Sequence, residues 1–283
     1  MSNFTNSIKQ WLPPAIYSFA EEIQNKRKHK LFDSYADALN YCSKDGYQND
    51  KLIDVIAYKM ADFLQKRTLM KQIDVTATQS FSLLPLIKLM CRQHGKKTFS
   101  VLDFGGNLGG HYFSMKDVVN NDLKLNWAVV ETPAMAKAGK QFENEELKFF
   151  DTIEAARKHL GTVDLVYTSG TLQCVDKPYT YLQMLIDIEA RFLFFNRLGL
   201  NRSNRDIVTI HHSKLSWNGP SGLPPGVEDQ IIKYPFSFIS EEKFMAQLNR
   251  KYAVRAQFSD DSGIFNVPNQ QIIGSGLLTE KKD

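Results

Sequence analysis

Asp103 precedes a cluster of glycines in the segment VLDFGGNLGGHYF, residues 101–113. The β-branched and aromatic residues before the glycines predict a buried strand, and the residues after them predict a helix. Glycines between a strand and a helix allow unusual backbone angles and let a ligand approach the main chain. The first N–H groups of the helix add hydrogen-bond donors. The segment predicts a ligand-binding loop beside an acidic residue; the alternative is a strand-to-helix turn that binds nothing.

The position of the acidic residue indicates which ligand the loop takes. A dinucleotide fold needs GxGxxG directly after the strand, and Asn107 stands where that pattern requires its second glycine. The loop instead reads DxGxNxG, which resembles motif I (D/E-x-G-x-G-x-G) of class I S-adenosylmethionine-dependent methyltransferases. The resemblance implies that Gly105, Gly106, Asn107 and Gly109 carry the amino-acid end of S-adenosylmethionine and that Asp103 contacts it. Asn107 departs from the usual glycine, but asparagine tolerates left-handed backbone angles.

Polar or small residues also end the next predicted strands. Glu131 follows LNWAVV and can accept both hydroxyls of a ribose; the alternative is an acidic residue in the first turn of a helix. Asp151, followed by Thr152, comes directly after ELKFF; the resemblance implies that Asp151 contacts the adenine amino group, and the alternative is that Asp151 caps the helix at 152–160. Ser169 and Gly170 end TVDLVYTSG, at a position that flanks the cofactor in this family. We predict that all five bind the cofactor.

A parallel sheet is needed to bring these residues together. Five apolar runs rich in β-branched and aromatic residues predict strands at 98–106, 125–132, 146–151, 162–170 and 191–198. Helical patterns separate them at about 112–120, 133–142, 152–160 and 177–190. Strands that alternate with helices form a parallel sheet with right-handed crossovers. We therefore expect the strand ends to meet at one edge of the sheet.

The last part of the chain predicts a different pairing. A helix over 240–250 is followed by strand-like runs at 252–258 and 270–280, which have no helix between them and should pair antiparallel. A mostly parallel sheet of seven strands with a C-terminal antiparallel hairpin is the usual arrangement of class I methyltransferases. We expect an α/β, Rossmann-like fold of this kind.

The first part of the chain reads as helical. Amphipathic patterns predict helices at 32–47, capped by Asp33 or Ser34 and ended by Gly46, at 51–70, and at 80–94 with a kink at Pro85. We expect residues 1–95 to form a helical extension and residues 96–283 to form the methyltransferase-like catalytic domain.

A wider resemblance covers most of the chain after residue 30. The matching segments are FDSYADALNYCSKDGY, VLDFGGNLGGHYF, WAVVETPAMAKAG, LKFFDTIEAA, VDLVYTSGTLQCVDKP, FLFFNRL and YPFSFISEEKF. They resemble a methyltransferase family found in bacterial surface-polysaccharide and O-antigen biosynthesis clusters. The first segment is the most specific, because other methyltransferases lack it. The resemblance implies a glycan or glycolipid-related acceptor.

Methyl transfer to a hydroxyl needs a group that removes a proton, and histidine suits this role near neutral pH. His111 follows the glycine loop, and its alternative is a helix residue that points to solvent. His211 and His212 follow the strand-like run IVTI, so one of them should face the pocket. The alternatives for this pair are packing and solvent exposure.

Four further residues are candidates for binding the acceptor. Tyr112 lies beside His111, and Arg197 ends the fifth predicted strand, where it can bind a phosphate or carboxylate. The alternative for Arg197 is an ion pair. Trp217 and Tyr234 belong to the segment 213–238, whose prolines and glycines predict a long loop that acts as a lid or substrate platform. A packed structural crossover is the alternative.

Composition and charge exclude several classes of protein. Hydrophobic residues are 43% and charged residues 23%, as in a globular protein, and the net charge of +4 is too small to argue for nucleic acid. The three cysteines are far apart, and no metal-ligand spacing appears, so we expect no metal site. No signal peptide or membrane span is evident, which favours the cytoplasm. The basic run Lys26–Lys30 predicts a solvated helix end; contact with an anionic membrane surface is the alternative.

The sequence therefore predicts an S-adenosylmethionine-dependent methyltransferase that acts on oxygen of a sugar or glycan intermediate in cell-surface polysaccharide synthesis. A small-molecule or glycan acceptor is the expected partner. Two alternatives stay open. A non-catalytic relative would use the fold for binding or scaffolding, which the unusual Asn107 favours. A nucleotide-dependent oxidoreductase is the other, and the GGNLGG order argues against it.

Overall fold

The structure is a computed structural model. It describes residues 30–42, 50–69, 95, 97–116, 123–259 and 272–283. The predicted helix at 80–94 and the basic residues 26–29 lie outside the described residues.

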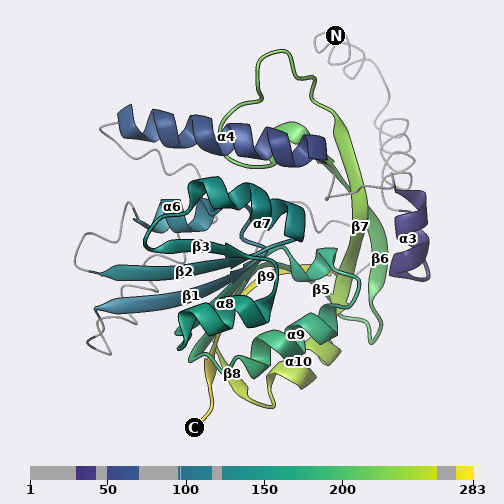
Figure 1. The fold of residues 1–283 in the computed structure, drawn as a ribbon. Helices are drawn as coiled ribbons and strands as arrows, with labels where there is room; N and C mark the ends of the chain where they lie inside the picture. Colours follow the sequence, from purple (N-terminus) through teal and green to yellow (C-terminus); the bar gives the residue numbers. More distant parts are fainter. Residues whose placement is uncertain (1–29, 43–49, 70–94, 96, 117–122, 260–271) are drawn as a thin grey trace, which may run out of the picture.

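Five parallel strands form the centre of the molecule (Figure 1). They are β1 (Thr98–Phe104), β2 (Lys124–Val130), β3 (Leu147–Phe150), β4 (Leu165–Ser169) and β5 (Phe192–Asn201). They lie in the order β3-β2-β1-β4-β5, and every neighbouring pair is parallel. Each strand was predicted from its apolar run, and β5 continues three residues beyond its predicted end. The carboxyl ends of β1, β2, β3, β4 and β5 therefore lie at one edge of the sheet.

The C-terminal strands close the sheet as predicted. β8 (Tyr252–Ser259) pairs antiparallel with β9 (Ile272–Lys281), and β9 pairs antiparallel with β5. The resulting order, β3-β2-β1-β4-β5-β9-β8, is mostly parallel and ends in an antiparallel hairpin. The chain thus has the Rossmann-like α/β fold of class I methyltransferases.

One prediction about the fold is wrong. Residues 213–238 are not a single long loop, because β6 (Ile207–Lys214) and β7 (Ile231–Ser240) form an antiparallel hairpin. Pro235 argued against a strand at the position of β7, because proline lacks the N–H that strand pairing requires. The end of β7 also pairs with the end of β5. The described sheet therefore has nine strands, and within residues 213–238 the loop is limited to the connection at 215–230, which begins with a short 3₁₀ helix, η4 (Leu215–Trp217).

Helices cover both faces of the parallel strands (Figure 1). One face carries α4 (Asp50–Leu69), α6 (Gly110–Lys116) and α7 (Pro133–Gly139), which is followed by η2 (Lys140–Phe142). The other face carries α8 (Ile153–Leu160), η3 (Leu172–Cys174), α9 (Pro178–Asp187) and α10 (Glu241–Leu248). Two large cores result, with fully buried Trp127 and Tyr167 in the first and Phe195 and Phe244 in the second.

The two described helices before the sheet pack on different parts of it. α3 (Tyr35–Tyr41) lies against β6 and β7, and Ser34 caps it as predicted, with its Oγ accepting the Asp37 N–H at 3.1 Å. α4 buries Leu52, Ile56 and Met60 in the same core as Trp127. Residues of the predicted extension therefore complete the core of the sheet. No helix among the described residues is long and apolar enough to cross a membrane.

Candidate functional site

The glycine loop joins the end of β1 to α6 through three residues with left-handed backbone angles. The φ angles are 76° at Gly105, 54° at Asn107 and 83° at Gly109. Asn107 thus adopts the conformation that made it acceptable in the motif, and its Oδ1 accepts the Leu108 N–H at 2.8 Å. The Gly105 N–H donates to the Val130 carbonyl at 2.8 Å, which holds the loop beside the end of β2.

Gly105 and Gly106 allow two close approaches that a side chain would block. A Cβ at Gly105 would lie 2.0 Å from Thr171 Oγ1, and a Cβ at Gly106 would lie 2.3 Å from Asp103 Oδ2. The loop therefore packs directly on the end of β4 and over the Asp103 carboxylate.

Asp103 is fully buried below the loop. Its Oδ2 lies 3.0 Å from His111 Nδ1 and accepts the Trp127 indole N–H at 3.1 Å. Its Oδ1 is buried without a hydrogen-bond partner in the described part of the chain. A buried carboxylate oxygen that lacks a donor is costly, so this oxygen is an acceptor suited to a ligand's donor.

Glu131, just beyond β2, binds the backbone of the glycine loop. Its Oε1 accepts the Asn107 N–H at 3.1 Å and its Oε2 accepts the Thr132 N–H at 2.9 Å. Burial, and to a smaller extent the nearby Asp103, raises the pKa of the Glu131 carboxyl to about 7, although the two N–H groups oppose the shift. Each carboxylate oxygen still has a lone pair for another donor, such as a hydroxyl.

The residues after β3 and β4 complete the same edge. Asp151 and Thr152 are exposed, and the Thr152 Oγ1 caps α8 by accepting the Ala155 N–H at 3.2 Å. The cap of α8 is therefore Thr152 and not Asp151, for which the capping alternative was stated. Ser169 and Gly170 are half-buried, and Gly170 has a φ of 72° and donates its N–H to the Asn196 carbonyl at 3.0 Å.

The structure separates the three candidate histidines. His111 faces Asp103, and its ring meets Tyr167 edge-on with centroids 4.9 Å apart, so it does not point simply to solvent. His211 packs between Tyr234 and Phe236, with ring centroids 5.2 and 5.4 Å away.

Burial lowers the pKa of His211 to about 4, and the charges of Arg197 and His212 add to the effect. His211 is therefore neutral at pH 7. His212 is the next residue of β6 and lies opposite Lys233 in the ladder, so its side chain leaves the other face of the strand.

The candidate acceptor residues have different surroundings. Tyr112 is buried in the core, and its hydroxyl donates to Asn144 at 3.3 Å and Glu146 at 3.1 Å. Both partners precede β3, at the amino edge of the sheet, so a substrate-binding role for Tyr112 is wrong on the position of its hydroxyl. Trp217 is 65% exposed in η4, and Tyr234 is half-buried beside His211.

Arg197 lies inside β5, one residue after the last pair between β4 and β5, and is half-buried. A Cβ added to Gly170 would lie 4.0 Å from its Nη1, so the guanidinium extends toward the end of β4. Asp103, Glu131, Gly170 and Arg197 thus gather at the carboxyl edge, as the sequence predicted.

Two residues that contribute to this arrangement, Trp127 and Gln173, were not predicted. Trp127 contacts Asp103, and Thr171 lies against Gly105. Gln173, in η3, donates a hydrogen bond to the Arg197 carbonyl. These contacts join residues far apart in the sequence, and no local pattern signals them. No group of three or more His, Cys, Asp or Glu in the described residues can hold a metal ion.

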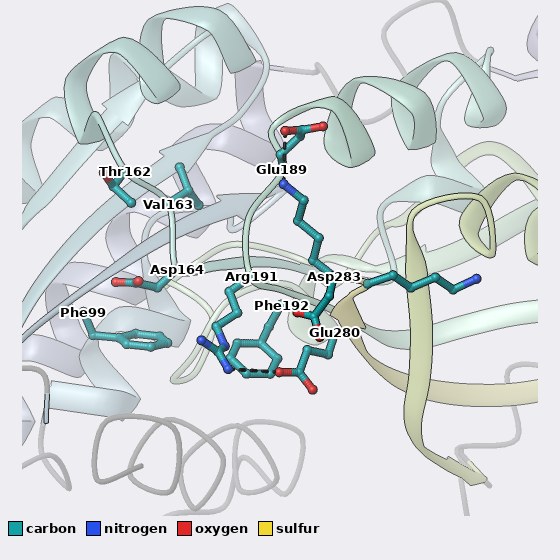
Figure 2. Close-up of a pocket in the computed structure, with 11 residues that line it drawn as sticks. Phe99, Thr162, Val163, Asp164, Glu189, Arg191, Phe192, Glu280 and Asp283 are labelled. Atoms are coloured by element: carbon teal, nitrogen blue, oxygen red, sulfur yellow. Dashed lines mark hydrogen bonds and ion pairs between the residues drawn. The ribbon is translucent and has the colours of Figure 1, made fainter. Parts of the chain in front are cut away.

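A cavity of about 640 Å³ lies at the other edge of the sheet (Figure 2). Its walls come from the starts of β1 and β5 and the end of β9, and include Phe99, Asp164 and Phe192. Arg191 and Glu280 form an ion pair there at 3.2 Å. Because parallel strands begin at this edge, the cavity is separate from the glycine loop and contains none of the predicted site residues.

Comparisons with known proteins give structural similarity only. No family model and no curated protein matches the chain. The 1,6-didemethyltoxoflavin-N1-methyltransferase of Burkholderia thailandensis is 13% identical; the match covers 79% of this chain and 87% of that one, with a TM-score of 0.41.

Two sugar-modifying enzymes show similar values. CalS10, an amino pentose methyltransferase from Micromonospora echinaspora, is 12% identical over 78% of this chain and 96% of its own, with a TM-score of 0.43. KedS8, a sugar N-methyltransferase from Streptoalloteichus sp ATCC 53650, is 12% identical over 79% and 93%, with a TM-score of 0.43. Values this low decide neither fold nor activity, and the fold follows from the order and direction of the strands.

Proposed function

We propose that the chain is an S-adenosylmethionine-dependent methyltransferase. The observation that carries the proposal is the buried Asp103 Oδ1, an acceptor without a donor beneath a glycine loop at the carboxyl edge of the sheet. In open α/β sheets this edge is where ligands bind. When bound, S-adenosylmethionine supplies an electrophilic methyl group.

The described residues fit that cofactor. Asp103 Oδ1 would accept a hydrogen bond from its ammonium group, and the left-handed turn through Gly105, Asn107 and Gly109 lets the main chain approach it. Glu131 would accept the ribose hydroxyls while it holds the Asn107 N–H. Asp151, exposed at the end of β3, would meet the adenine end.

His111 is the base that the geometry supports best. If the His111 Nδ1–H donates to Asp103, Nε2 is left as the acceptor for a proton. The carboxylate then also stabilises the imidazolium that forms, as in other acid–histidine pairs. His211, with a pKa lowered to about 4, is a much weaker base.

We propose a sugar or glycan intermediate of cell-surface polysaccharide synthesis as the acceptor and oxygen as the methylated atom. Support comes from the family resemblance of the matching segments and from the aromatic residues Tyr234 and Trp217 on the β6–β7 hairpin. The cytoplasm stays the expected location, and membrane contact through Lys26–Lys30 stays an expectation about a segment of which only Lys30 is described.

The Asp103→Asn variant tests the cofactor assignment. Loss of the negative charge should weaken S-adenosylhomocysteine binding about tenfold or more, because a charge-assisted hydrogen bond becomes a neutral one. Isothermal titration calorimetry measures the affinity, with the exposed Asp176→Asn as a matched control. Wild-type affinity in Asp103→Asn would contradict the role of this residue.

A non-catalytic binding or scaffold protein is the second candidate. The observation that favours it is the way the loop holds itself: both oxygens of Glu131 and one of Asp103 already accept hydrogen bonds from the protein. Wild-type protein that is folded but binds neither S-adenosylmethionine nor S-adenosylhomocysteine would favour this candidate over the methyltransferase.

A further inference from the structure

The backbone of Arg197 adopts a conformation that non-glycine residues rarely take. Its φ is 51°, inside strand β5, where the register with β9 shifts between Phe195 and Leu198. A bulge of this kind redirects a side chain, and a left-handed arginine stores strain. Strained residues of this type persist only where the surrounding fold holds them in place, and they are found mostly at functional sites.

A buried glutamine holds this conformation. Gln173 is 2% exposed, and its Nε2 donates to the Arg197 carbonyl at 2.8 Å. Its Oε1 accepts the Gly199 N–H at 3.4 Å, so the one amide bonds to a residue of the bulge and to a residue just after it. The fold therefore uses an internal side chain to fix the backbone from which the Arg197 guanidinium extends.

The guanidinium lies among elements that form the acceptor side of the candidate site. Its Nη1 is next to Gly170 at the end of β4. Its charge also lowers the pKa values of Tyr167, Cys174 and His211, which belong to β4, η3 and β6, although burial is the largest cause in each case. The charge of Glu131 raises the pKa of Cys174, which opposes the effect of Arg197. His211 stays neutral at pH 7.

We propose that Arg197 binds an anionic group of the acceptor, a carboxylate or a phosphate. The planar guanidinium matches two oxygens of either group at once, which a lysine does not. The cation is partly withdrawn from water, so an oxyanion bound to it gains more than one bound at the surface. The inference rests on the proposed function and narrows its acceptor to an acidic sugar or a phosphorylated one.

Binding of three simple probes to the full chain tests the inference. Glucuronate, glucose 6-phosphate and neutral glucose are titrated by calorimetry into protein saturated with S-adenosylhomocysteine. We expect at least one of the two anionic probes to bind about tenfold or more tightly than glucose, and the stronger of the two identifies the anion as carboxylate or phosphate.

Three variants separate charge from structure. Arg197→Asn removes the cation but keeps a residue that tolerates φ near 51°, so its Tm should equal or exceed that of wild type while anion binding falls about tenfold or more. Arg197→Lys should recover only part of the affinity. Arg191→Asn, just before the start of β5 and 52% exposed, should bind as wild type does.

Two results would overturn the inference: wild-type anion affinity in Arg197→Asn, or binding of both anionic probes no tighter than that of glucose. Titration of Arg197→Asn with S-adenosylhomocysteine alone keeps the two proposals apart. Wild-type cofactor affinity with lost anion binding assigns the defect to the acceptor side, whereas failure of the cofactor itself to bind wild type contradicts the proposed function.

Discussion

At the scale of single residues, the polar groups of the candidate site bind the backbone of the glycine loop in addition to the ligand proposed for them. Glu131 shows this most clearly, because its carboxylate accepts N–H groups from both Asn107 and Thr132. Burial nevertheless raises the pKa of this carboxyl from 4.5 to about 7, so its charged form costs free energy in the folded chain.

This shift predicts a pH dependence of stability. Between pH 4.5 and about 7 the folded chain holds a proton on Glu131 that the unfolded chain has lost, so the free energy of unfolding falls as pH rises through this range. The Glu131→Gln variant lacks this term. Relative to wild type, it should gain on the order of 2 kcal/mol from about pH 5 to about pH 8.

Chemical denaturation at several pH values measures that difference. The exposed Glu154→Gln on α8 is the control, and its curve should run parallel to that of wild type. Parallel curves for Glu131→Gln as well would contradict the raised pKa.

The local sequence predicted those site residues that lie close to one another in the chain. The acid, the glycines and Asn107 belong to one strand–loop–helix segment, so spacing alone placed them. Long-range partners escaped prediction, because Trp127 and Gln173 reach the site from other elements. The predicted substrate-binding role of Tyr112 was wrong for a related reason, because α6 directs its ring into the core.

At the scale of elements, the N-terminal helix α4 is tied to the connection between β6 and β7. Lys59 is fully buried, and its Nζ donates to the Ser216 carbonyl at 2.8 Å. Burial lowers the pKa of this lysine, with Asp229 opposing the shift. Gly219, with a φ of 72°, packs against Ile56 of the same helix. The segment 215–230 is therefore held against α4.

The Lys59→Met variant should loosen that segment. Met fills similar space but leaves the Ser216 carbonyl without its donor, which costs about 1–3 kcal/mol locally. Hydrogen exchange of residues 215–229 should become about tenfold faster, while the amides of β1 and β4 keep their protection. Lys51→Met, exposed on the same helix, should leave the exchange unchanged. Equal exchange in both variants would contradict the anchoring role.

Elements were predicted well where their signals were local. Ser34 caps a helix at the expected place, Thr152 caps α8 one residue after the expected Asp151, and the parallel strands follow their apolar runs. β7 was not predicted because its stability comes from pairing with β6. In this pairing Pro235, the residue that argued against a strand, lies opposite Ile210. Strand pairing of this kind depends on a partner that composition does not reveal.

At the scale of the whole molecule, the helical region and the sheet share one core. Leu52, Ile56 and Met60 are buried with Trp127 and Phe194 in a single cluster. The described helix α4 is thus part of the structure that forms the site, and the expected boundary at residue 95 does not separate two cores.

A shared core predicts one cooperative unfolding transition. Calorimetric and van't Hoff enthalpies should agree, and Ile56→Ala should shift the entire transition through a loss of about 2–5 kcal/mol. Tyr58→Ala, 43% exposed on the same helix, should change the transition much less. A first transition that moves alone in Ile56→Ala would show instead that α4 unfolds independently.

The hydrogen bond between Trp127 and Asp103 also gives the protein an internal fluorophore. This indole is fully buried and reports directly on the carboxylate that we assign to the cofactor, whereas Trp217 is 65% exposed and open to aqueous quenchers. Trp11, the third tryptophan, lies outside the described residues, so it is first replaced as Trp11→Phe. In that variant iodide should suppress the emission of Trp217 selectively and leave the signal of Trp127. The chain can report occupancy of its own glycine loop by tryptophan emission, without a label and without knowledge of the acceptor.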